Sequence, residues 1–173
     1  MVVQEGAVAP EFALESDAGN RVSLDDYADR WLVLYFYPKD NTPGCTREAQ
    51  AFSAAVPRLA KLGADVVGVS KDSVKTHCGF RDKFEIAFPL LSDPELTVHR
   101  AYGAFGEKTM YGKKVQGVIR STFLVGPDGK IARAWRGVKV DGHADKVIEA
   151  IEEARSEGKP PKKKPARRES KSR

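Results

Sequence analysis

The chain has 173 residues, of which 41% are hydrophobic, and this is enough to bury the core of one domain. No stretch approaches the roughly 20 apolar residues of a membrane span, and the N-terminus lacks the basic start and long apolar run of a secretory signal, so we expect a cytoplasmic protein. The net charge of +5 is unevenly divided: residues 1–155 hold 21 Lys and Arg against 22 Asp and Glu (net −1), whereas residues 156–173 hold 8 against 2 (net +6).

The first predicted elements are a hairpin and a buried strand. Residues 12–16 and 21–24 flank the turn sequence of residues 17–20, and this pattern predicts an N-terminal β-hairpin. Residues 31–37 are continuously apolar and rich in β-branched and aromatic side chains, which predicts a strand covered on both faces. Pro38 ends this strand.

A helix is predicted directly after this strand. Thr42 is suited to be its N-cap and Pro43 its first residue, and apolar residues then recur with helical spacing to about Gly63. Cys45 therefore falls in the first helical turn, where free backbone N–H groups and the helix dipole favour a thiolate over a thiol. A free cysteine is most often a small buried hydrophobic residue. The Pro-Gly sequence before Cys45, the helix start and the nearby hydroxyl instead indicate a reactive nucleophile.

The remaining elements continue the alternation of strands and helices. In chain order we predict a buried strand over 64–70, a helix capped by Asp72 or Ser73 that ends near Phe84, a short helix over 94–102, a hairpin of 121–125 and 130–135, and a closing helix over 144–155 with one apolar face. This order predicts the α/β class, with a mixed central sheet flanked by helices on both faces.

A basic tail follows the predicted domain of residues 1–155. Residues 156–173 are rich in Lys, Pro and Arg and have no apolar periodicity, so we predict that they are disordered. Residues 159–173 have the charge for weak, non-specific contact with nucleic acid or an anionic surface, and the alternative is a merely solvating tail. The tail carries no aromatic residue for base stacking, which argues against sequence-specific recognition.

The sequence around Cys45 also carries a family resemblance. Residues 36–46 read Phe-Tyr-Pro-Lys-Asp-Asn-Thr-Pro-Gly-Cys-Thr. They closely resemble the peroxidatic-cysteine motif of the peroxiredoxins, specifically of the bacterioferritin comigratory protein (Q-type) subfamily. The resemblance continues through residues 68–70, 88–93 and 120–125 and covers about residues 5 to 155. It implies a thioredoxin-like fold with Cys45 at a helix start beside the central sheet.

The resemblance also implies the residues that contact peroxide. The Cys45 thiolate would attack one oxygen, and the Thr42 hydroxyl, the Cys45 backbone N–H and the Arg120 guanidinium would contact the peroxide oxygens, with Pro38 and Pro43 shaping the pocket. The structural alternatives are that Thr42 only caps the helix and that Arg120 is an ordinary solvated residue.

Two further residues are candidates for supporting this site. Gly44 precedes the cysteine and completes the Pro-Gly sequence at the helix start. Glu48 is suited to orient Arg120, although a Glu near a helix start is also favourable for the helix dipole alone.

Cys78 is the candidate resolving cysteine. Many members of the subfamily carry that cysteine five positions after the peroxidatic one, where this chain has Gln50. A second group places it in the following helix, and Cys78 matches that group. A disulfide requires Cα atoms within roughly 7 Å, and two cysteines on separate helices seldom lie so close. We therefore expect the first turn around Cys45 and part of the helix around Cys78 to unwind in each cycle, helped by Gly79. The alternative is that Cys78 is a buried helix cysteine.

The chain lacks the residues that other functional classes require. A dithiol oxidoreductase requires a Cys-x-x-Cys pair, and the third position after Cys45 is Glu48. A zinc site lacks paired ligand spacing among the two cysteines and His77, His99 and His143, and we expect His77 to be an exposed helix residue. A nucleic-acid-binding module depends on the tail alone.

The sequence therefore predicts a thiol-dependent peroxidase that reduces hydrogen peroxide and small organic hydroperoxides, with no metal, haem or flavin cofactor. The resemblance implies an intramolecular disulfide between Cys45 and Cys78, recycling by thioredoxin or a similar dithiol reductant, and a monomer. The alternatives are a one-cysteine peroxidase recycled by an external thiol and a redox protein tethered to nucleic acid by its tail.

Overall fold

The computed structural model of the chain describes residues 3–156. Its main sheet has seven strands in the order β2-β1-β5-β4-β3-β8-β9. The strands β3, β4 and β5 run parallel, and the neighbours on either side run antiparallel to them. The strand bounds are Ala13–Ser16 (β1), Arg21–Ser23 (β2), Trp31–Phe36 (β3), Ala64–Ser70 (β4), Leu90–Ser92 (β5), Ser121–Val125 (β8) and Ile131–Arg136 (β9).

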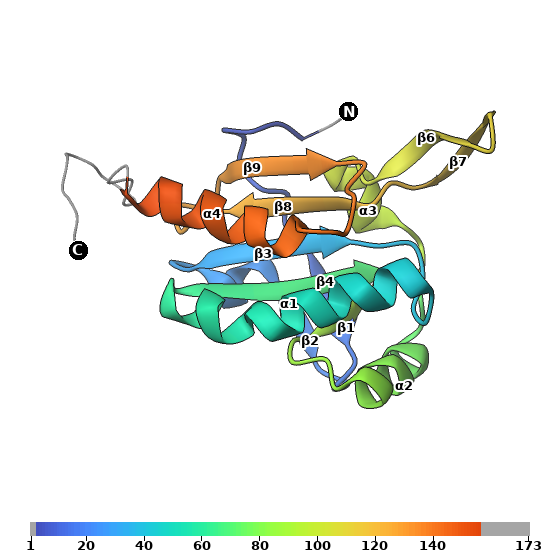
Figure 1. The fold of residues 1–173 in the computed structure, drawn as a ribbon, viewed down its shortest axis with the longest axis horizontal. Coiled ribbons are helices and arrows are strands. Elements are labelled where there is room, and N and C mark those ends of the chain that lie inside the picture. Colours follow the sequence, from blue (N-terminus) through green and yellow to red (C-terminus); the bar gives the residue numbers. More distant parts are fainter. Residues whose placement is uncertain (1–2, 157–173) are drawn as a thin grey trace.

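Helices lie on both faces of this sheet. The helices α1 (Pro43–Lys61) and α4 (His143–Ser156) cover one face, as Figure 1 shows. The opposite face packs against α3 (Thr97–Tyr102) and the 3₁₀ turn η1 (Leu24–Tyr27). The helix α2 (Val74–Phe84) lies at the β1–β2 side of the molecule (Figure 1).

The central strand β3 has two buried faces because its side chains alternate between two cores. Val33 and Tyr35 belong to the core under α1 and α4, whereas Leu32, Leu34 and Phe36 belong to the core on the opposite face. All six residues of β3 are buried, which explains why its sequence is continuously apolar.

The sheet brings two distant segments to the end of β3. Phe36, the last residue of β3, is paired with Ser121, the first residue of the antiparallel strand β8. Arg120 therefore lies beside the loop that connects β3 to α1. Because α1 begins after this loop, its first turn and Arg120 meet at the same edge of the sheet.

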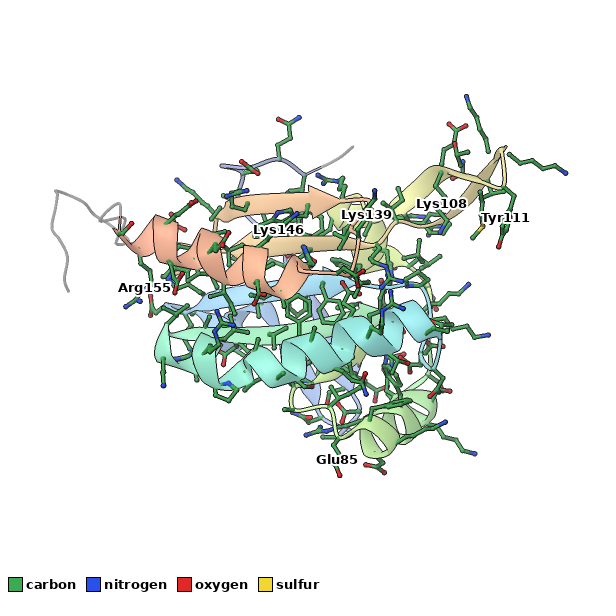
Figure 2. The ribbon with its side chains drawn as sticks, in the orientation of Figure 1. Glu85, Lys108, Tyr111, Lys139, Lys146 and Arg155 are labelled. Carbon is green, nitrogen blue, oxygen red and sulfur yellow. The ribbon has the colours of Figure 1, made fainter. Side chains whose placement is uncertain are left out.

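A two-stranded sheet projects from the body of the molecule. The strands β6 (Phe105–Met110) and β7 (Lys113–Val118) are antiparallel, and they lead directly into Ile119 and Arg120. Tyr111 lies at the tip of this hairpin and is 97% exposed (Figure 2).

The structure confirms the expected mixed α/β architecture, the predicted hairpins of residues 12–24 and 121–135, and all four predicted helices. The structure adds three elements that the sequence did not predict: η1, the short strand β5 and the β6–β7 hairpin. The predicted disorder of the tail concerns residues outside those described, apart from Ser156, which ends α4. Among the described residues, no helix is both long and apolar enough to cross a membrane.

Candidate active site

Cys45 is placed by the first turn of α1. Pro43 is the first residue of the helix, and the Thr46 N–H donates to the Thr42 carbonyl at 2.8 Å. The N–H of Cys45 precedes this first helical hydrogen bond, so it is one of the free N–H groups at the helix start. The side chain points into the core and is 1% exposed. Cys45 is thus a buried thiol beside the positive end of a 19-residue helix.

Arg120 joins Cys45 to Glu48. Its Nη2 donates to the Cys45 Sγ at 3.3 Å, and its Nη1 donates to the Glu48 Oε1 at 2.6 Å. Gly44 allows this approach, since a Cβ at that position would lie 3.3 Å from the Arg120 Nη2. One guanidinium therefore holds the thiol and a buried carboxylate together.

Burial and the neighbouring charges act in opposite directions on the pKa of each member of this pair. Desolvation raises the pKa of Glu48 from 4.5 to about 7, and the Arg120 guanidinium acts in the opposite direction. For Arg120, burial lowers the pKa, but the charges of Glu48 and Cys45 outweigh it and the net pKa is raised. Arg120 is therefore a cation at every physiological pH. The Glu48 Oε2 is buried without a hydrogen-bond partner among the described residues.

Thr42 occupies the predicted N-cap position but does not cap the helix with its side chain. Its hydroxyl instead donates to the Lys39 carbonyl at 2.9 Å. The lone pairs of the hydroxyl oxygen remain as acceptors. Pro38 is half-buried after β3, and Pro43 is exposed at the start of α1.

Cys78 lies apart from this group, on α2. Its Sγ–H donates to the Asp17 carbonyl at 2.9 Å, in the turn between β1 and β2. Cys45 and Cys78 are both free thiols, and each has a different partner on a different element. The structure thus brings Cys45, Glu48 and Arg120 together and leaves Cys78 outside that contact.

His77 is buried, and the expectation that it would be an exposed helix residue is wrong. Its side chain is 0% exposed and its Nδ1 pairs with the Asp40 Oδ2 at 2.6 Å. Its Nε2–H donates to the Leu91 carbonyl at 2.9 Å. No local pattern around His77 predicts this contact, because Asp40 is 37 residues away.

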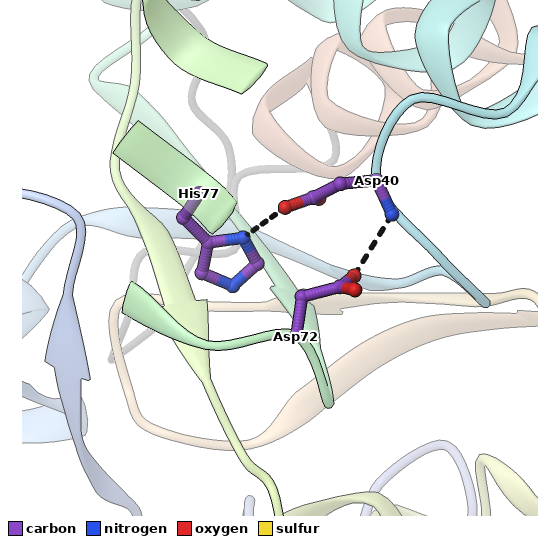
Figure 3. A group of neighbouring side chains, drawn as sticks. All are labelled: Asp40, Asp72 and His77. Carbon is purple, nitrogen blue, oxygen red and sulfur yellow. Dashed lines mark hydrogen bonds and ion pairs between the residues drawn. The ribbon is translucent and has the colours of Figure 1, made fainter. Parts of the chain in front are cut away.

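Asp72 completes a cluster with Asp40 and His77 (Figure 3). One ligand atom from each lies within 4.8 Å of the others, a spacing that a metal ion would accept. The Asp72 Oδ2 accepts from the Asp40 N–H at 2.8 Å and from the Ser70 hydroxyl at 2.7 Å. The Asp40 Oδ1 accepts from the Tyr37 hydroxyl at 2.6 Å. Because the facing atoms already have protein partners, the cluster is a hydrogen-bond network.

Comparison with known proteins places the chain in a family. Residues 6–134 match the AhpC/TSA family. Peroxiredoxin Bcp of Xanthomonas campestris is 48% identical over 150 residues, which cover 87% of this chain and 94% of that protein. Peroxiredoxin Bcp of Bacillus subtilis is 39% identical over 153 residues, which cover 88% of this chain and 98% of that protein.

Solved structures show the same likeness. A structure of the Xanthomonas campestris bacterioferritin comigratory protein matches with a TM-score of 0.81 and 45% identity, over 87% of this chain and 98% of that chain. The structure of a Xylella fastidiosa peroxiredoxin Q mutant matches with a TM-score of 0.84 and 41% identity, over 90% of this chain and 99% of that chain. The fold is thus thioredoxin-like, as the motif implied. The chain belongs to the AhpC/TSA family and, within it, to the Bcp (Q-type) peroxiredoxins, which are thiol peroxidases.

Proposed function

We propose that this thiol peroxidase reduces hydrogen peroxide and small organic hydroperoxides through Cys45. The Cys45 thiolate attacks one peroxide oxygen, so that an S–O bond forms while the O–O bond breaks. The sulfur becomes a sulfenic acid, and the leaving oxygen takes a proton and departs as water or an alcohol. The observation that carries this proposal is the contact between Arg120 and the Cys45 Sγ.

Arg120 has two roles in this reaction. Before the attack, its Nη2 holds the Cys45 Sγ at the helix start, where a guanidinium cation is a favourable neighbour for the attacking sulfur. During the attack, negative charge develops on the leaving oxygen, and a fixed guanidinium and the Cys45 backbone N–H are suited to stabilise it. Glu48 is the positioning residue for Arg120, because it binds the opposite side of the same guanidinium. Thr42 supplies a hydroxyl oxygen that accepts from the incoming peroxide.

Cys78 is the proposed resolving residue. Its thiolate attacks the Cys45 sulfenic sulfur, an S–S bond forms, and hydroxide leaves and is protonated to water. Thioredoxin or a similar dithiol then reduces the disulfide by exchange. The two thiols lie on different helices and have separate partners, and in this proposal the first turn of α1 and part of α2 unwind to bring them together. Only His77 and Phe80 of α2 are buried, which favours local unwinding of this helix.

Two parts of this proposal have alternatives: the class of peroxide that is reduced and the route by which Cys45 is recycled. Alkyl peroxide reduction activity is described for the Xanthomonas campestris bacterioferritin comigratory protein, and it supports organic hydroperoxides as substrates here. A one-cysteine cycle, in which an external thiol attacks the sulfenic acid, is the second candidate, because Cys78 donates to a backbone carbonyl in a way that a purely structural cysteine also would.

Intact mass after one equivalent of peroxide distinguishes the two cycles. The two-cysteine cycle gives the wild-type chain a loss of two hydrogens, and gives Cys78→Ser a gain of one oxygen with a single stoichiometric burst in the thioredoxin-coupled assay. Full thioredoxin-supported turnover of Cys78→Ser would make Cys78 structural and leave the one-cysteine cycle.

A further inference from the structure

A buried Asp–His pair connects the segments that carry the two cysteines. Asp40 lies in the loop that leads into α1, five residues before Cys45, and His77 is the residue before Cys78 in α2. Both side chains of the pair are 0% exposed, and their Oδ2 and Nδ1 atoms are 2.6 Å apart (Figure 3). The pair therefore ties the segment around one cysteine to the helix around the other.

Hydrogen bonds satisfy the pair on every side. The Nε2–H of His77 donates to the Leu91 carbonyl in β5, and one proton lies between Nδ1 and the Asp40 carboxylate. The second oxygen of Asp40 accepts from the buried Tyr37 hydroxyl at 2.6 Å. The Asp40 N–H donates to Asp72, which lies just before α2. The folded arrangement of both segments thus depends on one set of contacts.

Unwinding either segment leaves the other with an unsatisfied buried group. If α2 unwinds and His77 departs, the buried Asp40 carboxyl loses its hydrogen-bond partner, and leaving one member of a buried pair without its partner is strongly unfavourable. If the loop before Cys45 moves first, His77 loses its acceptor in the same way. The pair therefore opposes unwinding of either segment alone and favours unwinding of the two segments together.

We propose that Asp40 and His77 are positioning residues that couple the unwinding of α2 to the unwinding of the Cys45 segment and so set how often oxidised Cys45 is resolved. The coupling itself is a property of the folded chain, whereas its effect on resolution depends on the proposed role of Cys78.

Two fates of the Cys45 sulfenic acid compete in this scheme. In the folded arrangement a second peroxide oxidises it to a sulfinic acid, as one oxygen is transferred to sulfur and water or an alcohol leaves. In the unwound arrangement Cys78 attacks it and the disulfide forms. A stronger Asp40–His77 contact prolongs the folded arrangement and therefore favours over-oxidation.

The test compares His77→Leu and Asp40→Asn with wild type. Hydrogen exchange followed by mass spectrometry is read for residues 38–46 and 74–84 in the reduced protein. Both variants should raise exchange about tenfold in the two segments together, the size expected for loss of a charge-assisted hydrogen bond. Tyr37→Phe removes one hydrogen bond to Asp40 with little change in shape, so it should act in the same direction more weakly and serves if a larger change prevents folding.

A second buried Asp–His pair supplies the matched control. His99 Nδ1 lies 2.7 Å from Asp93 Oδ2, and His99 is fully buried in α3. His99→Leu removes the same kind of Nδ1–carboxylate contact in a segment that carries neither cysteine. His99→Leu should not raise hydrogen exchange in residues 38–46 and 74–84 relative to the rest of the chain.

Single-turnover chemistry gives the functional readout. His77→Leu should form the Cys45–Cys78 disulfide about tenfold faster after one equivalent of peroxide, while the first oxidation stays within about twofold, and over-oxidation should need about tenfold more peroxide. Equal effects in His99→Leu, or faster exchange confined to residues 74–84, would overturn the proposal. If Cys78→Ser turned over fully, the resolving role would fail, and the exchange result would still decide whether the coupling exists.

Discussion

The Arg120 guanidinium touches the Cys45 sulfur and the Glu48 carboxylate at once, at 3.3 Å and 2.6 Å. Cys45 and Glu48 lie on α1 and Arg120 directly precedes β8, and they meet because β8 runs antiparallel to β3 and begins where β3 ends. A cation held in this way cannot rotate freely toward solvent, and only 18% of its side chain is exposed. The thiol, the cation and the carboxylate thus form one preorganised unit.

Arg120→Ala should slow the attack of Cys45 on hydrogen peroxide by about 10²- to 10³-fold, because it removes the donor that faces the developing charge. Rapid-mixing measurement of the second-order rate constant checks this. Arg120→Lys keeps the charge but loses the forked contact with both Cys45 and Glu48, so it should recover only part of the rate. The rate of Cys45 alkylation at neutral pH should fall in Arg120→Ala as well, and an unchanged rate would place Arg120 outside the site.

Glu48→Gln tests the raised pKa of the buried carboxyl. Desolvation raises the pKa of Glu48 to about 7 in the folded state, compared with 4.5 for an ordinary glutamate in the unfolded chain. The folded state therefore binds this proton more tightly than the unfolded state. The stability that follows is fully present below pH 4.5 and is lost as the pH rises through 7. The free energy of unfolding of wild type should therefore fall relative to Glu48→Gln between these values, by up to about 3 kcal/mol.

Urea unfolding at several pH values between 4 and 8 measures this difference. Glu149→Gln, on the exposed face of α4, is the matched control and should run parallel to wild type. A constant difference between wild type and Glu48→Gln across the range would contradict the assignment of the raised pKa to Glu48.

Gly44→Ala should disturb catalysis without disturbing the fold. The new Cβ would lie 3.3 Å from the Arg120 Nη2, so the guanidinium must shift away from the position it holds between Cys45 and Glu48. Alanine is a better helix residue than glycine, and stability should stay within about 1 kcal/mol. Peroxide attack should slow by about tenfold. Gly79→Ala, whose Cβ would meet nothing within 4 Å, should leave the first oxidation unchanged.

Local patterns allowed most of the fold to be predicted. The Thr-Pro start of α1, the continuous apolar run of β3 and the one-sided apolar face of α4 are properties of neighbouring residues, and each element was found where it was expected. The β6–β7 hairpin was missed because most of its side chains are exposed on both faces, so no alternation marks it. The short strand β5 has only three residues, too few for a period.

Long-range contacts limited what the sequence revealed about the site. Cys45 was identified from its local surroundings, whereas Arg120 entered only through the resemblance to a family motif. His77 was misjudged because its burial depends on Asp40 and Leu91, which lie on other elements. A histidine in a helix carries no local signal that a carboxylate 37 residues earlier will meet it.

Deleting residues 156–173 should separate the tail from catalysis. These residues carry a net charge of +6 from 8 Lys and Arg against 2 Asp and Glu. The truncated chain should keep the full peroxidase rate and lose any retention on DNA or anionic resin, and the retention of the whole chain should weaken steeply with salt. Retention that persisted after truncation would assign a basic surface to residues 1–155.

Peroxide consumption by Cys45→Ser tests the central claim most directly. Serine preserves the size of the side chain but is not ionised at neutral pH, so the variant should fold normally, as near-ultraviolet circular dichroism would verify, and should consume no peroxide above the uncatalysed rate. Its intact mass should not change after one equivalent of hydrogen peroxide. Retained turnover in a folded Cys45→Ser protein, or oxygen added to the variant at Cys78, would contradict the assignment of Cys45 as the nucleophile.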